Sequence, residues 1–283
     1  MAPRAPAPRI STPAPAVVKQ PVKQFTVAPW TGAGDGEKII LYGPSGMGKT
    51  TLASAAPDPV FIGVDDGGRK ILNPKTGQPV QTVRDAEGRL PETFADVRAV
   101  LQSGVFDGHA TAVIDTATML QHWAQTHMFA VIPHEKGTRV SSIEGYGYGK
   151  GYRHLFDLMH SILADCDRLV RAGKNIIIIC QEAAVAETNT AGENYFKSGP
   201  NLHHSDKASV RKDYIEWADH VFRIGWEGAS VEDRKITPVK SRVINVHPDA
   251  TFEAKSRTLG ADCAAVTFTD PQDDSIWQLL FGG

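Results

Sequence analysis

The chain has 283 residues, of which 41% are hydrophobic and 22% charged, and its formal net charge at pH 7 is −2. This composition is ordinary for a globular protein and fits one large domain with tails. With a net charge so close to zero, the protein as a whole does not attract nucleic acid. A nucleic-acid partner would therefore need a local patch of positive charge. The three cysteines, Cys166, Cys180 and Cys263, have neither disulfide nor zinc-site spacing.

Residues 1–24 are rich in alanine and proline, carry four cations and have no acidic residue. Such a segment buries too little apolar surface to fold, so we expect residues 1–29 to be a disordered tail and residues 30–283 one folded domain. No apolar run is long enough to span a membrane, and the N-terminus has no apolar signal core. We therefore expect a cytoplasmic protein without membrane contact.

The first predicted strand, residues 38–42, leads into a glycine-rich segment and then into a helix at residues 51–56. The segment has the spacing G-x-x-x-x-G-K-[ST], in which glycines let backbone N–H groups wrap a phosphate and the helix start adds a positive end. We expect Lys49 to reach the β- and γ-phosphates of ATP and Thr50 to bind Mg²⁺; a glycine-rich surface turn is the alternative. The predicted nucleotide contacts are Gly43, Pro44, Ser45, Gly46, Met47, Gly48, Lys49, Thr50 and Thr51.

Two later strands end in acidic residues. Residues 59–64 precede Asp65 and Asp66, and the strand at residues 110–115 ends in Asp115. An apolar strand that delivers a carboxylate to the edge of a sheet is the second signature of a nucleotide site, where the carboxylate holds the water shell of Mg²⁺. Asp115 is therefore the second predicted metal residue, with a turn-forming aspartate as the alternative.

The rest of the chain alternates helices and strands. Residues 153–171 place apolar side chains on one helical face, and residues 175–180 form a buried strand that ends at Gln181. Residues 182–207 lack periodicity, which is typical of a long functional or disordered loop. The other predicted elements are strands near 79–83, 220–226, 235–240, 243–247 and 251–255, helices at 91–103, 210–217 and 274–281, and a helix directly after residue 116. This order predicts a mainly parallel α/β sheet with helices on both faces and ligands beyond the carboxyl ends of its strands.

Together these motifs resemble the RecA-like P-loop ATPase core, and most closely the phage-encoded, core-only RecA-like proteins that bind ATP and assist single-strand annealing. The resemblance runs from Glu37 to Gly260. It rests on the phosphate loop, Asp65-Asp66-Gly67-Gly68, Asp115-Thr116, Gly147-Tyr148-Gly149-Lys150-Gly151-Tyr152, Gln181, Trp217-Ala218-Asp219 and Ala254-Lys255-Ser256-Arg257. It implies a RecA-like fold, with a mainly parallel sheet flanked by helices and short strands at the C-terminus.

The resemblance also implies catalytic roles beside that of Lys49. It places Asp66 where the family prefers a glutamate that activates the attacking water; aspartate is one methylene shorter, so we expect slow hydrolysis, and capping of the next turn is the alternative. Gln181 resembles the residue that senses the γ-phosphate, with a strand-end hydrogen bond as the alternative. Lys255 and Arg257 resemble a Lys-x-Arg pair that reaches the γ-phosphate of a neighbouring subunit; two solvated surface cations are the alternative.

Residues 133–151 and 182–207 resemble the DNA-contacting loops of RecA. Aromatic rings in the first segment are expected to stack on bases and cations to contact phosphates, with a glycine-rich hinge and packed rings as the alternative. The predicted DNA-binding residues are Tyr146, Tyr148, Lys150, Tyr152, Arg153 and Lys197. Phe25 and Ala28 resemble the Phe-x-x-Ala segment that anchors one recombinase subunit on the next, with packing on the chain's own core as the alternative.

The leading expectation is an ATP-hydrolysing, single-stranded-DNA-binding homo-oligomer, either a ring or a filament, that assists phage recombination. Its expected cofactors are ATP and Mg²⁺, and a single-strand-binding protein is a further expected partner. Two alternatives stay open. The first is a P-loop ATPase switch or motor of another kind, such as a helicase loader or packaging accessory, and the second is an assembly protein that ATP locks with little turnover.

Overall fold

The computed structural model describes residues 26–29, 31–32, 34–188, 191–232, 235–238, 241–268 and 270–282. The chain divides into two units, Met1–Ala33 and Gly34–Gly283, and the described helices and strands all belong to the second. Residues 1–25 of the predicted tail at residues 1–29, including Phe25 of the predicted anchor, lie outside the described residues. Val27, next to that anchor, is exposed.

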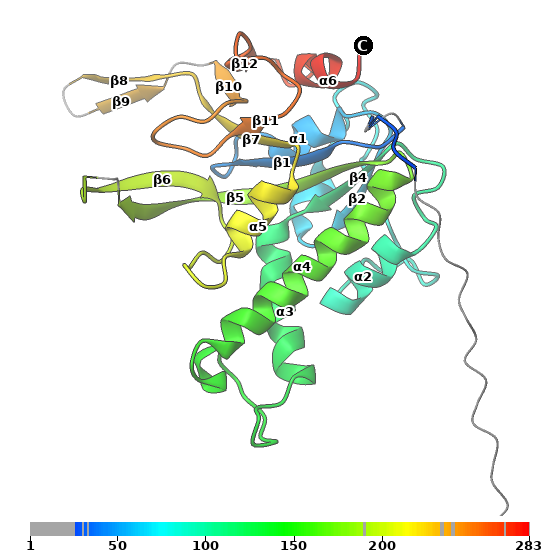
Figure 1. Ribbon diagram of the computed structural model, residues 1–283. Coiled ribbons are helices and arrows are strands. Elements are labelled where there is room, and N and C mark those ends of the chain that lie inside the picture. The colour runs from blue at the N-terminus through cyan, green and yellow to red at the C-terminus, as the bar shows by residue number, and fades with distance from the viewer. Residues whose placement is uncertain are drawn as a thin grey trace, which may run out of the picture. The chain divides into compact units, whose positions relative to one another are not determined.

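A sheet of mostly parallel strands forms the centre of the second unit (Figure 1). Its parallel strands follow the order β7-β1-β5-β4-β2-β3. Their bounds are β1 Lys38–Gly43, β2 Pro59–Gly63, β3 Gln81–Thr82, β4 Thr111–Asp115, β5 Asn175–Thr188 and β7 His220–Trp226. Short antiparallel strands continue the sheet beyond β7, namely β10 Arg242–Asn245, β11 Lys255–Ser256 and β12 Ala265–Phe268. The predicted fold class, a mainly parallel sheet flanked by helices with short C-terminal strands, is confirmed.

Alternate residues of the central strands enter two core layers on opposite faces of the sheet. On β1, Ile39 and Leu41 face one layer, while Ile40 and Tyr42 face the other. Residues 176–180 of β5 divide in the same way and are fully buried. A parallel strand covered on both faces has no solvent-facing positions, which is why this stretch of β5 is apolar without interruption.

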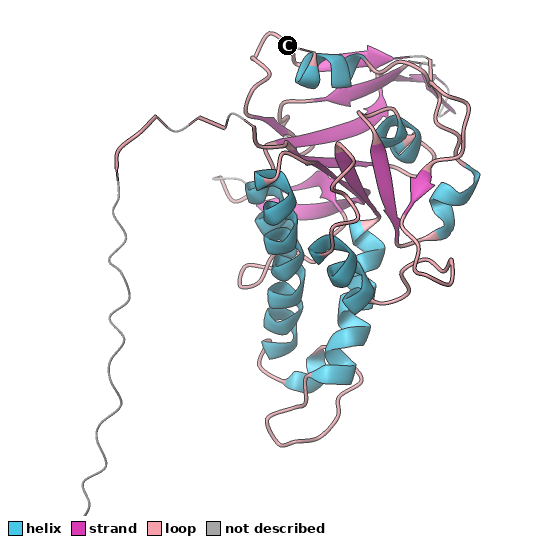
Figure 2. Cartoon of the chain, turned by 90° about the vertical axis from the view of Figure 1, so that its right-hand side faces the viewer, coloured by secondary structure: helices cyan, strands magenta, loops and turns pink. Residues whose placement is uncertain are grey.

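Helices cover both faces of the sheet (Figure 2). One layer contains α2 Phe94–Gln102, α3 Ala117–Val131, α4 Lys150–Arg171 and α5 Val210–Trp217, and the other contains α1 Lys49–Ser54 and α6 Ser275–Phe281. The indole N–H of Trp277 in α6 donates to the Leu52 carbonyl of α1 at 2.8 Å. The C-terminal helix therefore supports the helix that follows the phosphate loop. Among the described helices, none combines the length and the apolarity needed to cross a membrane.

Helix α3 and the first turns of α4 extend away from the sheet, and residues 132–149 connect them at the end of this projection (Figure 1). Helix α4 begins after Gly149, whose φ of 74° favours glycine. Its apolar residues recur every third or fourth position, so one stripe of the helix is buried. The glycine-rich motif before α4 is thus the turn by which the chain re-enters the long helix.

Residues 182–207, which the sequence predicts as a loop, are partly strand. Strand β5 runs on to Thr188 and pairs antiparallel with β6 Asn194–Pro200. This half of the strand pairs with β6 but packs on no buried layer, so its alternate residues stay exposed and the apolar periodicity is lost. The strands β8 Ala229–Glu232 and β9 Lys235–Pro238 form a hairpin. The sequence predicted β9 but neither β8 nor β12.

Candidate nucleotide site

The predicted phosphate loop lies between β1 and α1, at the carboxyl ends of the parallel strands. Its course depends on glycine at two positions. Gly48 precedes α1 with a φ of 91°, a left-handed conformation that favours glycine. At Gly43, a Cβ would overlap the carbonyl oxygen of Ile224 on β7. The chain can therefore turn tightly from strand to helix, as the motif requires.

Lys49 is buried inside this loop, with 9% of the residue exposed. Its ammonium donates to the carbonyl oxygens of Gly43 at 2.8 Å and Pro44 at 2.9 Å. Burial lowers the pKa of Lys49, and the negative charge of Asp115 opposes that change. An ammonium has three N–H donors, so two hold Lys49 across the loop and the third can serve a phosphate oxygen.

Thr50 and Asp115 are in direct contact. The Thr50 hydroxyl donates to Oδ2 of Asp115 at 2.8 Å, and Asp115, the last residue of β4, is 4% exposed. Burial raises the pKa of Asp115 to about 6, against the Thr50 hydrogen bond, which favours the ionised form. Hydroxyl and carboxylate oxygens are ligands that Mg²⁺ prefers. The two predicted metal residues therefore meet at the start of α1, with a donor set that fits the ion.

A cavity of about 390 Å³ opens beside the loop. The predicted residues on its wall are Ser45, Gly46, Gly48, Lys49, Thr50, Thr51, Asp115 and Gln181. Gly43 and Pro44 instead turn their carbonyls to Lys49, and the Met47 side chain enters the core with 3% exposed. The structure thus brings most of the predicted nucleotide residues to one wall.

Gln181 reaches this wall because β5 lies next to β1, in a register that pairs Gln181 with Gly43. Its backbone N–H donates to Oγ1 of Thr118 at 3.1 Å. The Thr118 hydroxyl in turn donates to the Asn201 carbonyl at 3.1 Å. Sequence reasoning missed Thr118, and its only local signal was a second threonine shortly after Asp115.

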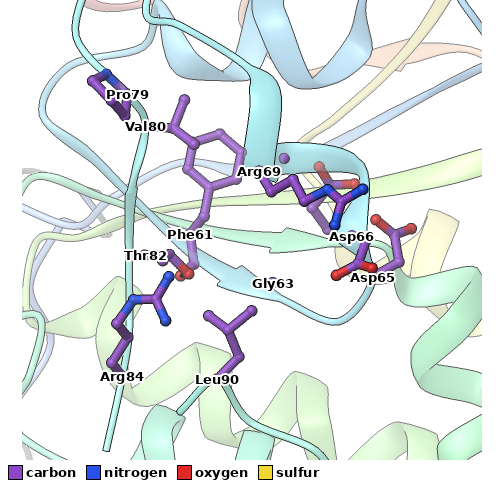
Figure 3. A pocket seen from close by; sticks show the side chains of 12 residues that line it. Phe61, Gly63, Asp65, Asp66, Arg69, Pro79, Val80, Thr82, Arg84 and Leu90 are labelled. Carbon is purple, nitrogen blue, oxygen red and sulfur yellow. Dashed lines mark hydrogen bonds between the residues drawn. The ribbon is translucent and has the colours of Figure 1, made fainter. Parts of the chain in front are cut away.

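The two aspartates after β2 occupy different places. Asp65 lines both the phosphate-loop cavity and a neighbouring cavity of about 170 Å³, whereas Asp66 lines only the second of these two (Figure 3). The Asp65 N–H donates to the Asp115 carbonyl at 3.3 Å, which keeps Asp65 at the edge of the sheet. Asp66 begins the short helix η1, Asp66–Lys70. The geometry therefore favours Asp65 over the predicted Asp66 for the position next to the phosphates.

The predicted DNA-binding tyrosines do not share one environment. Tyr146 is 3% exposed, and its hydroxyl donates to two carbonyl oxygens at the end of α3, at 2.7 and 3.1 Å. Its ring is part of the core, so the prediction that Tyr146 stacks on bases is wrong. Tyr148 is fully exposed. Tyr152 stacks on the His203 ring at 4.6 Å, and its hydroxyl donates to Glu144.

The predicted DNA-binding cations all have acidic partners. The ion pairs are Lys150–Glu135, Arg153–Asp157 at 3.0 Å and Lys197–Glu253 at 3.3 Å. The pairs of Lys150 and Arg153 are exposed, and such pairs cost little to break. The side chain of Lys197 is only 19% exposed, so it is the least accessible of the three.

Lys255 and Arg257 lie at the amino ends of the parallel strands, whereas the phosphate loop lies at their carboxyl ends. Strand β11 pairs with the first residues of β7, whereas the loop follows the last residue of the parallel β1. Lys255 donates to the carbonyls of Ile215 at 2.8 Å and Glu216 at 3.2 Å, and Arg257 donates to Glu216 at 3.4 Å. Both cations therefore bind the free carbonyls at the end of α5, and neither meets the chain's own nucleotide site.

Solved structures to which the chain is similar include the flagellar accessory protein FlaH from Methanocaldococcus jannaschii, with 11% identity over 83% of this chain and 85% of that chain and a TM-score of 0.43. The RadB recombinase has 14% identity, coverage of 75% and 80%, and a TM-score of 0.40. A KaiC-like protein from Pyrococcus horikoshii OT3 has 13% identity, coverage of 83% and 90%, and a TM-score of 0.41.

Among curated proteins, none matches the sequence. A family profile described as an AAA domain matches residues 35–258, which include the phosphate loop, Asp115, Gln181 and the Lys255–Arg257 pair. The match covers most of the chain, and the chain belongs to the AAA domain family.

Proposed function

We propose that the protein binds ATP together with Mg²⁺ at the phosphate loop and hydrolyses it. The observation that carries this proposal is the contact between Thr50 and Asp115, 65 residues apart in sequence, beside the buried Lys49. A phosphate loop alone is a generic anion site. A loop hydroxyl that meets a carboxylate from another strand of the same sheet is the arrangement that holds a metal-bound triphosphate. Membership of the AAA domain family supports the same activity.

Each residue of the site then has a physical task. Lys49 binds oxygens of the β- and γ-phosphates, and Gln181, the last residue of β5 that pairs with β1, offers its side-chain amide to the γ-phosphate. Thr50 and Asp115 hold Mg²⁺, which when bound neutralises charge on the phosphate oxygens. Asp65 orients the attacking water. Because its side chain is one methylene shorter than glutamate, we expect slow turnover.

Nucleotide binding and phosphate release test this proposal, each measured with Mg²⁺ and with a chelator. We expect Lys49→Ala to lose binding, and Asp115→Asn to bind ATP without a gain from Mg²⁺. Asp65→Asn should lose turnover, while the matched control Asp66→Asn keeps it. A wild-type protein that does not bind ATP, or Lys49→Ala that turns over ATP like the wild type, overturns the proposal.

We further propose that the protein acts on single-stranded DNA as a homo-oligomer. The support is the segment that connects α3 and α4, where Tyr148 is fully exposed. Lys136 and Arg139 in the same segment are exposed, and within the described part of the chain they form no ion pair. An accessible ring and exposed cations in one segment are the combination that binds single strands. In this proposal, the protein acts in phage recombination together with a single-strand-binding protein.

Turnover with and without an oligothymidylate strand tests this second proposal. Stimulation in the wild type, and its loss in the double variant Lys136→Gln, Arg139→Gln, supports it. Arg171→Gln, an exposed cation at the far end of α4, is the control. Directional unwinding by the purified protein favours a motor, and ATP-dependent assembly without DNA stimulation favours a nucleotide-locked assembly protein.

A further inference from the structure

The guanidinium of Arg242 touches the outside of the phosphate loop. Arg242 is the first residue of β10, which lies between β7 and β12. Its Nη1 donates to the carbonyl oxygen of Met47 at 3.0 Å, across 195 residues of sequence. A strand that takes no part in the phosphate motif therefore contacts the loop, and we call this side of the loop the outer side because Arg242 does not line the phosphate-loop cavity.

Two neighbours fix the position of this guanidinium. Phe268 pairs with Arg242 across β12 and β10, and its buried ring lies 5.8 Å from the guanidinium carbon. On the other side, a Cβ at Gly48 would lie 2.6 Å from Nη1. Arg242 can approach the loop this closely only because residue 48 is glycine. The contact thus depends on the aromatic ring of β12 and on the loop glycine together.

The hydrogen bond to Met47 has a consequence for the inner side of the loop. The carbonyl of Met47 and the N–H of Gly48 belong to one planar trans peptide, so they point in opposite directions. Arg242 holds the carbonyl on the outer side and thereby turns the Gly48 N–H toward the inner side, where a phosphate binds. A hydrogen bond to the carbonyl also polarises the peptide and strengthens its N–H as a donor.

Arg242 also adds charge to the site. Within the described residues it forms no ion pair with a carboxylate, so its charge is not neutralised locally. Lys49 supplies one positive charge on the inner side of the loop, and Arg242 supplies a second behind it. Both attract the phosphates of a nucleotide in a partly buried environment, where charges interact more strongly than in bulk water.

We propose that Arg242 is a positioning residue of the nucleotide site, which holds the phosphate loop in its binding conformation from outside and adds positive charge behind it. The inference rests on the proposed ATP-binding function. This role differs from a purely structural one, because the effect of Arg242 on binding should grow with the number of phosphates on the ligand.

Titration calorimetry with ATP, ADP and adenosine tests the charge. Arg242→Gln should weaken ATP binding about tenfold, the equivalent of losing about one charge-assisted hydrogen bond, with a smaller loss for ADP and none for adenosine. Arg242→Lys restores charge and should recover part of the affinity, most clearly at low salt. Turnover at saturating ATP should change less than the dissociation constant.

Hydrogen–deuterium exchange without nucleotide tests the positioning. The amides of residues 45–50 should exchange faster in Arg242→Gln than in the wild type. Arg168→Gln is the matched control, because Arg168 also donates to backbone carbonyls, those of Leu101 and Ser103, but at the far end of α4. It should change neither loop exchange nor ATP binding. Should Arg242→Gln fail to fold, Arg242→Lys is compared with Arg168→Lys in the same measurements.

The outcomes separate this inference from the proposed function. If Lys49→Ala loses ATP binding while Arg242→Gln binds ATP and exchanges its loop like the wild type, the inference is overturned and the proposed function stands. If the wild type binds no ATP, the proposed function fails. In that case, unchanged loop exchange in Arg242→Gln overturns the positioning role as well, and faster exchange supports it.

Discussion

Asp115 carries a carboxyl group whose pKa is raised to about 6 from an ordinary value of 3.8, chiefly because it is buried beside the phosphate loop. Between these two values the folded protein holds a proton that the unfolded chain has lost. The free energy of unfolding therefore falls as the pH rises through this window. Above it, the ionised and buried carboxylate costs the apo protein about 3 kcal/mol, a cost that a bound cation offsets.

Asp115→Asn should for this reason stabilise the apo protein at pH 7.5 in the presence of a chelator, by about 2 kcal/mol. The gain should shrink as the pH is lowered from 6 to 4, because Asp115 in the folded wild type is then protonated and no longer carries a buried charge, while the unfolded chain gains its own proton only as the pH approaches 3.8. Urea denaturation across this pH range measures the effect, with the exposed Asp66→Asn as control. Equal stability of wild type and Asp115→Asn at pH 7.5 would contradict the burial argument.

Tyr146 and Tyr148 differ in burial, so their substitutions should have opposite signatures. Tyr146→Phe removes a hydroxyl that donates to two carbonyls and should lower stability by about 1–2 kcal/mol without changing DNA affinity. Tyr148→Ala should leave stability unchanged and weaken single-strand binding, because one stacked base contributes about 1–3 kcal/mol. Thermal unfolding and fluorescence anisotropy give the two readouts. Loss of DNA binding in Tyr146→Phe alone would reverse the assignment.

At the scale of elements, one threonine at the start of α3 joins the middle of β5 to the segment after β6. Thr118 accepts the N–H of Gln181 at 3.1 Å and donates to the Asn201 carbonyl at 3.1 Å. The N–H of Asn201 completes the link by donating to the Gln181 carbonyl at 2.8 Å. These bonds set the position of Gln181 at the wall of the nucleotide cavity.

Thr118→Val keeps the shape of the side chain but leaves the Gln181 N–H and the Asn201 carbonyl without their partner. We expect a loss of about 1–3 kcal/mol in the free energy of unfolding. Since Gln181 is then less well placed, turnover should fall more than ATP affinity does. Thr118→Ser keeps the hydroxyl and should restore turnover. If Thr118→Val turns over ATP like the wild type, Gln181 needs no such support.

Elements with a complete local signal were predicted well. Helix α5 and strand β7 have the predicted bounds, because apolar periodicity and flanking residues both mark their ends. The far half of β5 and its partner β6 were missed, because their strand conformation depends on mutual pairing and not on burial. In the site, the loop motif located Lys49 and Thr50. The choice of Asp65 over Asp66 and the contact of Arg242 depend on the register of the chain and on long-range contacts, which no local pattern encodes.

At the scale of the whole molecule, the phosphate loop and Arg257 are the two parts of the chain that could meet in a contact between subunits. They lie at opposite ends of the parallel strands. The phosphate loop follows the end of β1, and Arg257 lies beside Asp219, near the start of β1 and β7. A strand of this length spans about 17 Å, so Arg257 is far from the chain's own nucleotide. Such a placement allows a head-to-tail contact in which the Arg257 edge of one copy meets the loop of the next.

Arg257 is the better residue for testing a role across such a contact. Its side chain is 57% exposed and makes a 3.4 Å ion pair with Asp219. Lys255 instead donates two hydrogen bonds to the end of α5, and its loss should destabilise that helix end. If Arg257 reaches a neighbour's γ-phosphate, Arg257→Ala should bind ATP normally and lose most turnover. Arg171→Ala removes an exposed cation at the C-terminal end of α4 and should keep full turnover.

Mixing Arg257→Ala with Lys49→Ala then gives a decisive measurement. Neither variant alone has an interface with both an intact loop and an intact Arg257. In a mixed assembly, the loop of an Arg257→Ala copy can meet Arg257 of a Lys49→Ala copy, so part of the ATP turnover should return. The recovery should depend on the mixing ratio and peak near equal amounts, with co-assembly verified by light scattering. If verified co-assemblies are no more active than the separate variants, Arg257 acts only within its own chain, as a cation at the end of α5.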